Sequence, residues 1–237
     1  MIKRVFALRI LAIETTERQG SIALWESGTL QYYHLLPAED RSAATLAPEI
    51  KSVCAKQGWA LGDIDRFAVT TGPGSFTGLR VGIVTTKTLG YALSKEVVGI
   101  NTLDAIAIQS SHTGELDVVM DAQRNEVFSR RYLLKNGKLP KALNEVCIID
   151  DQQWAEQLPR GIKVTGPVLK KLKNTLPAHV QIEAEVNWAP RAESVAHLAA
   201  TASPIDSPLK LMPEYFRKSA AEEKLAHTNN PNPSNQT

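Results

Sequence analysis

The stretch TTGPGSFTGLRVG, residues 70–82, groups glycines, a proline and hydroxyl side chains between two apolar segments. The segment before it, DRFAVTT (65–71), is typical of a buried strand. In the segment after it, from Thr77 to Leu93, apolar residues recur at helical spacing. Glycine-rich connections from a strand to a helix bind phosphate in some proteins and carry a nucleophile in others. The spacing of the glycines decides which of these chemistries the stretch supports.

The spacing supports none of the three known chemistries. Gly72 and Gly78 have five residues between them where a P-loop has four, and Leu79 stands where a P-loop needs lysine. Gly72, Gly74 and Gly78 give G-x-G-x-x-x-G, which is one residue longer than the dinucleotide fingerprint. Thr77 occupies the place of the second glycine in a nucleophile elbow.

A structural role fits the stretch better. Gly72 and Gly74 flank a proline and permit a sharp reversal, because glycine accepts positive φ and proline fixes its own φ. Ser75 or Thr77 can cap the helix that follows. We therefore interpret Gly72, Gly74, Ser75, Thr77 and Gly78 as a rigid strand–helix connection. Binding of an anion by the free N–H groups of the helix start is the alternative that remains open.

The rest of the chain repeats one pattern twice, namely a meander of strands followed by alternating helices and strands. Strands are expected at 10–14, 21–26, 30–36, 65–71, 96–100, 116–122, 125–135, 145–150, 161–166 and 180–184, and helices at 42–57, 77–93, 101–109, 151–157, 169–172 and 193–202. We predict an N-terminal lobe at 1–110 and a C-terminal lobe at 111–218. The remaining tail, 219–237, is expected to be disordered because its end, HTNNPNPSNQT, has no large apolar residue.

Composition argues against direct binding of nucleic acid or membrane. The 237 residues carry 27 Lys and Arg against 25 Asp and Glu, a net charge of only +2. No segment approaches the ~20 apolar residues of a membrane span. The two cysteines, Cys54 and Cys147, match no metal or redox spacing and fit a reducing compartment. We expect a cytoplasmic protein.

Four segments resemble one known family in order along the chain. The run GPGSFTGLRVGIVTTKTLGYAL (72–93) resembles the signature of the TsaB family, also called YeaZ, and LAIETT with GSIAL (11–24) resembles its opening hairpin. MDAQRNEVF (120–128) and PEYFR (213–217) resemble its second-lobe start and its C-terminal motif. The resemblance implies an α/β fold of the actin-like ASKHA class, with two tandem ribonuclease-H-like lobes built on mixed five-stranded sheets with flanking helices.

The resemblance also implies a function. Members of this family are non-catalytic subunits in the bacterial synthesis of N6-threonylcarbamoyladenosine at position 37 of ANN-decoding tRNAs. They pair with the catalytic relative TsaD and with the ATPase TsaE, and they form homodimers when alone. The chain would then scaffold and activate TsaD, would meet tRNA only indirectly, and would bind no cofactor of its own, since the partner holds ATP. The alternatives are an actin-fold ATPase or phosphotransferase, or a metallopeptidase.

The residues argue against both of these enzyme activities. An actin-like ATPase needs an acidic residue in the first hairpin, and Glu14 provides it where the family usually has Asp. It also needs a D-x-G turn in the second lobe, where Asp121 is followed by Ala122 and Gln123. Glu14 and Asp121 are thus the only candidates for residual nucleotide contacts. The five histidines are too scattered for a metal site, so we expect no catalytic residues and no metal.

The resemblance places the partner surface on the two helices of the first lobe, at 42–57 and 77–93. The expected partner-binding residues are Arg41, Ala43, Ala44, Leu46, Ala47, Ile50, Phe76 and Arg80. Two alternatives stay open from the residues alone. The stripe of Leu46 and Ile50 can face the chain's own sheet, and Lys87 can pair with Glu14 if it is buried. The helix at 42–57 also lacks the histidine that the family usually has near its start.

Overall fold

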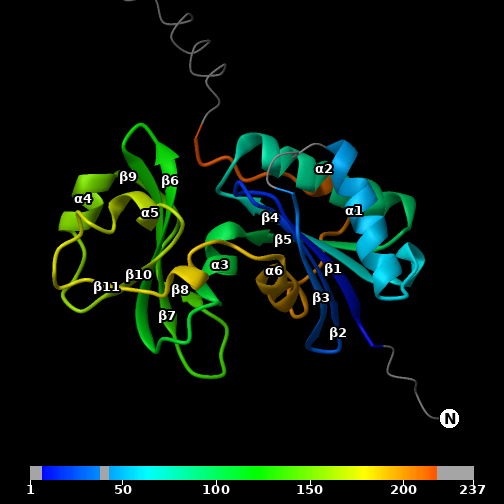
Figure 1. The fold of residues 1–237 in the computed structure, drawn as a ribbon, viewed down its shortest axis with the longest axis horizontal. Helices are drawn as coiled ribbons and strands as arrows, with labels where there is room; N and C mark the ends of the chain where they lie inside the picture. Colours follow the sequence, from blue (N-terminus) through cyan, green and yellow to red (C-terminus); the bar gives the residue numbers. More distant parts are fainter. Residues whose placement is uncertain (1–6, 38–42, 218–237) are drawn as a thin grey trace, which may run out of the picture.

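The computed structural model describes residues 7–37 and 43–217, which form two sheets side by side (Figure 1). The sheet from the first half of the chain lies at the right in Figure 1 and the second sheet at the left, with α3 (Thr102–Ala107) and α6 (Ala192–Ala199) between them. No helix in these described ranges is long and apolar enough to cross a membrane. The predicted disordered tail lies outside the described residues.

The first sheet combines an antiparallel meander with parallel strands, in the order β3-β2-β1-β4-β5. β1 pairs with β2 and β2 with β3 in antiparallel fashion, whereas β4 runs parallel to β1 and β5 parallel to β4. β1, β2 and β4 are buried along nearly their whole length, because helices cover both faces of the sheet, whereas the edge strand β3 is partly exposed. Their bounds are β1 Arg9–Glu14, β2 Ser21–Glu26, β3 Thr29–Leu35, β4 Arg66–Gly72 and β5 Glu96–Asn101.

Two long helices, α1 (Ala43–Lys56) and α2 (Phe76–Ala92), cover the outer face of this sheet (Figure 1). Leu11 and Ile13 of β1 point to that face, because side chains alternate along a strand. They form one core with the inward stripes of both helices. The outward faces of α1 and α2 therefore adjoin each other on the surface of the molecule.

The second sheet has six strands, not the five expected. Its order is β11-β10-β6-β7-β8, and β9 pairs with β7 beside that path. A long antiparallel hairpin of β6 and β7 forms its centre. Its strands are β6 Gly114–Gln123, β7 Glu126–Leu134, β8 Lys141–Ala142, β9 Cys147–Asp150, β10 Lys163–Thr165 and β11 Gln181–Ile182. The helices that follow them are α4 Asp151–Glu156 and α5 Leu169–Leu172, and the short 3-10 helices of the chain are η1 Leu61–Asp63, η2 Glu185–Asn187 and η3 Pro208–Lys210.

The end of the chain returns to the first sheet. α6 follows the second sheet in sequence, yet Ala192, Val195 and Ala196 pack on the inner face of the first sheet, against Ile10 and Ala12. Beyond α6, η3 runs beside α2, and Leu211 joins the core under that helix. Residues assigned by sequence to the second lobe thus cover the inner face of the first sheet.

Candidate functional site

The glycine stretch is packed against the turn that follows β1. Gly78 lies so close to this turn that a Cβ there would fall far inside 3.0 Å of the carbonyl oxygen of Thr15. Gly74 has φ +152°, and a Cβ there would collide in the same way with the side chain of Thr16. Only glycine fits at these two positions without moving backbone atoms. The first turn of α2 is therefore placed by direct contact with the end of β1.

Hydrogen bonds fix the same contact. The N–H of Ser75 donates to the carbonyl of Thr16 at 2.9 Å, and the hydroxyl of Thr15 donates to the carbonyl of Gly78 at 2.8 Å. The hydroxyl of Ser75 accepts from the N–H of Gly78 at 3.3 Å, which makes Ser75 the N-cap of α2. Thr77, the other capping candidate, is exposed in the first turn. The stretch is a rigid connection held from both sides.

The C-terminal motif lies against the start of this connection. The N–H of Glu214 donates to the carbonyl of Thr71 at 2.8 Å. The carboxylate of Glu214 accepts from the Thr71 hydroxyl at 2.9 Å and from the Asn101 amide at 3.2 Å. Gly72, with φ +130°, leaves room for this contact, since a Cβ there would lie 2.6 Å from the carbonyl oxygen of Glu214. Segments more than a hundred residues apart in sequence thus meet at the ends of β4 and β5.

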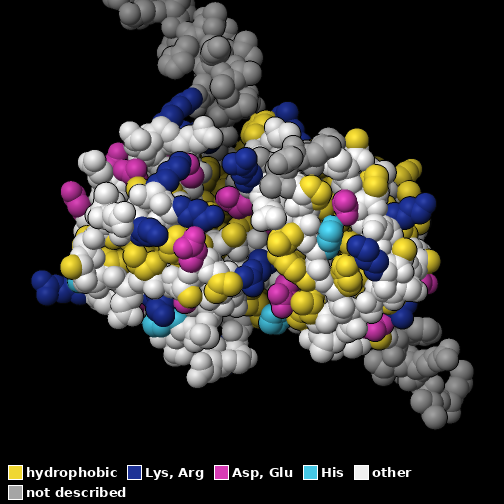
Figure 2. Space-filling view, in the orientation of Figure 1, with side chains coloured by type: hydrophobic (Ala, Val, Ile, Leu, Met, Phe, Trp, Pro, Cys, Tyr) yellow, Lys and Arg dark blue, Asp and Glu magenta, His cyan; other side chains and the backbone are white. Residues whose placement is uncertain are grey.

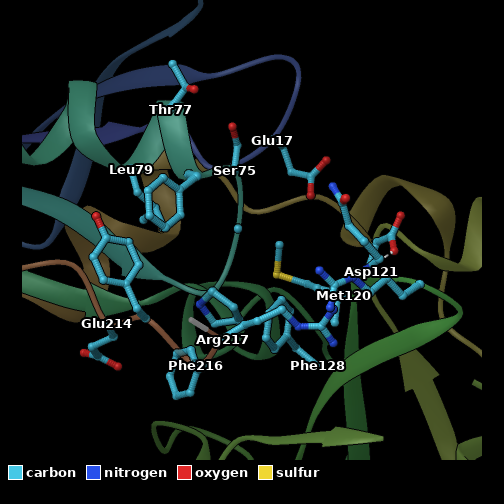
Figure 3. Close-up of a pocket in the computed structure, with 17 residues that line it drawn as sticks. Glu17, Ser75, Thr77, Leu79, Met120, Asp121, Phe128, Glu214, Phe216 and Arg217 are labelled. Carbon is cyan, nitrogen blue, oxygen red and sulfur yellow. Dashed lines mark hydrogen bonds between the residues drawn. The ribbon is translucent and has the colours of Figure 1, made fainter. Parts of the chain in front are cut away.

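A pocket of about 490 Å³ opens between the two sheets at this point. Figure 3 shows Ser75, Thr77 and Leu79 from the start of α2 on one side and Met120, Asp121 and Phe128 from β6 and β7 on another. Its remaining walls are Glu17, Pro73, Gly74, Phe76, Ala122, Gln123, Arg124 and the segment Glu214–Arg217. The volume is in the range of small-molecule sites.

Asp121 lines this pocket, but both oxygens of its carboxylate already bind other groups of the chain. One oxygen accepts from the N–H of Gln123 at 2.8 Å, and the other pairs with the ammonium group of Lys171. Partial burial opposes the charge, but the Lys171 and Gln123 hydrogen bonds outweigh it, so the pKa of Asp121 is lowered. The turn beyond it is strained, because Gln123, Arg124 and Asn125 have φ values of 63°, 56° and 59°.

Glu14, the other candidate for a nucleotide contact, is not among the residues that line the pocket. Its side chain is fully buried, and one carboxyl oxygen accepts from the N–H and the hydroxyl of Thr16. The second oxygen has no hydrogen-bond partner among the residues that the structure describes. Burial raises the pKa of Glu14 to about 8, so the group is mainly protonated at neutral pH. The alternative pairing with Lys87 is wrong, because within the described part of the chain one oxygen of Glu14 is bound to Thr16 and the other has no partner.

The expected partner residues divide into two groups. Ala44, Ala47 and Arg80 are exposed, and Phe76 is half-buried. Leu46 and Ile50 are only 3% and 2% exposed and belong to the core between α1 and the sheet, so they cannot contact a partner. The burial of these two side chains corrects that part of the prediction. Arg41 and the side chain of Ala43 lie outside the described residues.

Four exposed apolar side chains near α2 were missed from the sequence. Val84 and Tyr91 on α2 are 58% and 66% exposed, and Leu209 and Met212 beside the helix are 59% and 63% exposed. We call these four, together with Ala44 and Ala47, the α2 surface. Val84 and Tyr91 are seven residues apart, which places both on one side of α2, about a quarter turn round the helix from the buried Ile83. Leu209 and Met212 lie more than a hundred residues further along the chain, and no local pattern connects them with α2.

No group of three His, Cys, Asp or Glu side chains suited to a metal ion occurs in residues 7–37 and 43–217. The expectation of no metal stays a prediction for the whole chain. The carboxylates discussed above carry no such site either, because Asp121 pairs with Lys171 and Glu14 is enclosed by protein.

Known proteins resemble the chain over most of its length. A family model described as TsaD, tRNA N6-adenosine threonylcarbamoyltransferase, matches residues 37–198. The tRNA threonylcarbamoyladenosine biosynthesis protein TsaB of Bacillus subtilis is 25% identical over 224 residues, which cover 92% of this chain and 97% of that protein. An uncharacterized protein of Mycobacterium tuberculosis is 32% identical over 180 residues, covering 76% of this chain and 77% of that protein.

The structure of YeaZ from Pseudomonas aeruginosa superimposes with a TM-score of 0.74 at 22% identity, covering 88% of this chain and 100% of that chain. This likeness confirms the predicted fold class of two α/β lobes on mixed sheets. The TsaB protein of Escherichia coli is 32% identical over 129 residues, covering 53% of this chain and 55% of that protein. Because the TsaD model matches well over half of the chain and the Bacillus subtilis protein aligns with nearly all of it, the chain belongs to the TsaB (YeaZ) family of tRNA threonylcarbamoyladenosine biosynthesis proteins.

Proposed function

We propose that the chain is a non-catalytic subunit that docks a TsaD-like catalytic protein on the α2 surface, and scaffolds and activates it together with a TsaE-like ATPase. The observation that carries the proposal is the exposure of four large apolar side chains on and beside α2. Clustered apolar side chains at a surface are typical of interaction sites rather than of bare solvent-facing helices. The small side chains of Ala44 and Ala47 on α1 allow a partner helix to approach closely.

The non-catalytic role is supported by the state of the two carboxylates. Asp121 is neutralised by Lys171, and Glu14 is buried and mainly protonated, so neither is available as a free anion for magnesium or phosphate chemistry. We therefore propose that ATP is bound by the partner rather than by this chain. A homodimer formed through the same α2 surface is the proposed state of the chain when it is alone.

Contact with tRNA is proposed to be indirect. On the face shown in Figure 2, dark blue Lys and Arg side chains are interspersed with magenta Asp and Glu side chains over the described residues. With a net charge of +2, the chain offers little of the phosphate neutralisation on which nucleic-acid affinity depends.

The docking proposal predicts a large effect of Val84→Glu. A carboxylate placed among the apolar side chains of the α2 surface would lose its hydration when a partner covers it. We expect at least about a tenfold weaker affinity for the TsaD-like protein of the same organism, measured by calorimetric titration. Val186→Glu is the matched control, because Val186 is 63% exposed in η2, on the other half of the molecule. Equal affinity of both variants and the unchanged protein would remove α2 from the interface.

The cofactor proposal predicts that the isolated chain has no micromolar affinity for Mg-ATP. The glycine stretch lacks a P-loop lysine, and Asp121 is paired within the chain. Calorimetric titration of the isolated chain measures this directly. Saturable micromolar binding that is lost in Asp121→Asn would support an actin-fold ATPase or phosphotransferase instead.

A further inference from the structure

The segment Pro213–Arg217, which we call the strap, contacts both halves of the molecule with successive side chains. In Figure 1 this part of the chain runs along α2 toward the second sheet. It also forms one wall of the pocket between the sheets. The strap is therefore in a position to connect the α2 surface with the pocket.

The N-terminal part of the strap contacts residues of the first sheet and of α2. Glu214 is held by Thr71 and Asn101 at the ends of β4 and β5. The ring of Tyr215 stacks on Phe76 with 4.5 Å between ring centroids and 20° between planes. The guanidinium group of Arg80 lies 4.3 Å from the Phe76 ring centre and donates to the Tyr215 hydroxyl at 3.2 Å. Tyr215 remains 45% exposed, so a partner on α2 can still cover it.

The C-terminal part of the strap contacts the β6–β7 hairpin. The ring of Phe216 meets Phe128 of β7 edge to face, with centroids 6.1 Å apart and planes at 61°. Arg217 forms an ion pair with Glu126, the first residue of β7. Phe216 is also packed against the core of the second sheet. These contacts lie next to the strained turn at Gln123–Asn125 that borders the pocket.

We propose that the strap couples docking on the α2 surface to the position of the β6–β7 turn, so that a bound partner closes or orders the wall of the pocket. The proposal rests on the proposed docking function. Its physical basis is that Tyr215 and Phe216 are adjacent residues with different partners, and each is anchored by an aromatic contact. A partner that restrains Tyr215 also restrains the backbone of Phe216. Because Phe216 contacts Phe128 of β7, the restraint extends to the β6–β7 turn. The coupling is reciprocal, so a ligand in the pocket changes affinity at α2 by the same factor.

The isolated chain provides the first test. Hydrogen exchange is measured at the amides of residues 121–128 in the unchanged protein, in Tyr215→Ala and in Tyr91→Ala. Loss of the Tyr215 stack should speed exchange at these amides by roughly tenfold, the equivalent of one good aromatic contact. Tyr91→Ala removes an equally large exposed ring from α2, outside the strap, and should leave these amides unchanged. Amides of β1 and β4 serve as the reference for global opening in each variant.

Two results would overturn the coupling in this test. One is unchanged exchange at residues 121–128 in Tyr215→Ala, and the other is an equal increase in Tyr91→Ala. If Tyr215→Ala lowers global stability, Tyr215→Phe keeps the stack and loses only the Arg80 hydrogen bond, so its exchange should fall between the other two proteins.

The second test adds the TsaD-like protein. We expect bound partner to slow exchange at residues 121–128 of the unchanged chain, and to leave these amides unprotected in Phe216→Ala, in which the α2 surface is intact. Binding without any protection of the hairpin would overturn the coupling while the docking proposal stands. Absence of binding to the unchanged chain would overturn the docking proposal, and with it the coupling to docking, while the isolated-chain comparison would still show whether the strap links the two lobes.

Discussion

Replacing Gly78 by alanine is expected to lower the free energy of unfolding by at least about 3 kcal/mol, the upper part of the range for overpacking. The added Cβ would meet the carbonyl oxygen of Thr15, which is backbone and cannot rotate away. Relief requires α2 to move off the end of β1, and such a shift breaks the hydrogen bond from the Thr15 hydroxyl to the Gly78 carbonyl. Urea unfolding followed by circular dichroism measures the loss.

Gly62→Ala is the matched control for this substitution. Gly62 lies in η1, a Cβ there meets no atom of the described residues within 4 Å, and its backbone does not have positive φ. Alanine at this position should be neutral or stabilise the protein by up to about 1 kcal/mol, because it restricts the unfolded chain. If Gly78→Ala were as stable as Gly62→Ala, the close contact between α2 and β1 would not exist in solution.

The loss of stability also predicts a loss of docking. Gly78 lies in the first turn of the helix that carries Val84 and Tyr91, and the same turn holds Phe76 against the strap. A displaced α2 therefore disturbs the whole α2 surface even though Gly78 itself is buried. Co-purification of the folded fraction of Gly78→Ala with the TsaD-like protein should be reduced, whereas Gly62→Ala should co-purify normally.

The second large effect concerns the pH dependence of stability at Glu14. In the folded state, burial raises the pKa of Glu14 to about 8, whereas an ordinary glutamate has a pKa near 4.5. Between these values the folded chain keeps a proton that the unfolded chain has lost. The contribution of Glu14 to stability is thus fully present below pH 4.5 and is lost progressively as the pH rises to 8. Above pH 8 both states are ionised and the effect levels off.

Glu14→Gln removes this titration while keeping an oxygen that can accept from Thr16. We expect the free energy of unfolding of the variant, relative to that of the unchanged protein, to increase by roughly 4 kcal/mol between about pH 5 and pH 8.5. Between the two pKa values of Glu14, each pH unit changes the free energy of unfolding of the unchanged protein by about 1.36 kcal/mol. Urea unfolding at several pH values measures the difference. Glu156→Gln, at an exposed position of α4, is the control for the chemical change from carboxyl to amide. Parallel pH profiles for Glu14→Gln and the unchanged protein would mean that Glu14 is ionised when folded.

A protonated Glu14 also explains how the first lobe tolerates a carboxyl group at the end of a core strand. One oxygen of the group accepts hydrogen bonds from Thr16, and the protonated group carries no charge that would need a counter-ion. The turn that follows can then pack tightly under the glycine stretch. Glu14 is therefore a structural residue of the β1 turn in this protein, and Gly74 and Gly78 close over that turn.

The sequence predicted the order of the elements well, because each depends on a local pattern. The expected strand 21–26 is β2, and the expected helices 77–93 and 169–172 are α2 and α5 within one residue. Their apolar periodicity is contained in a few consecutive residues. The additional strand β8 was missed, since Lys141 and Ala142 carry no such pattern.

The candidate site was predicted less completely. The sequence points to the glycine stretch, to Asp121 and to the family motif PEYFR, and the structure brings all three to one pocket. Leu46 and Ile50 were assigned to the partner surface although they belong to the core, because a helical stripe shows only that one face is apolar. Which face of α1 meets the sheet depends on how the helix packs, and in the fold this stripe joins one core with Leu11 and Ile13 of β1.

The sequence by itself determined the element order, the rigid glycine connection and the family, because these depend on residue type and spacing along the chain. Only the tertiary structure decided that α6 covers the inner face of the first sheet, that Glu14 keeps its proton, and that the strap contacts both halves. Burial, pKa and ring stacking are set by residues far apart in sequence, such as Phe76 with Tyr215. The stretch TTGPGSFTGLRVG illustrates this division. Its glycines can be identified in the sequence, but only the fold shows that they leave room for the backbone of Thr15 and Glu214.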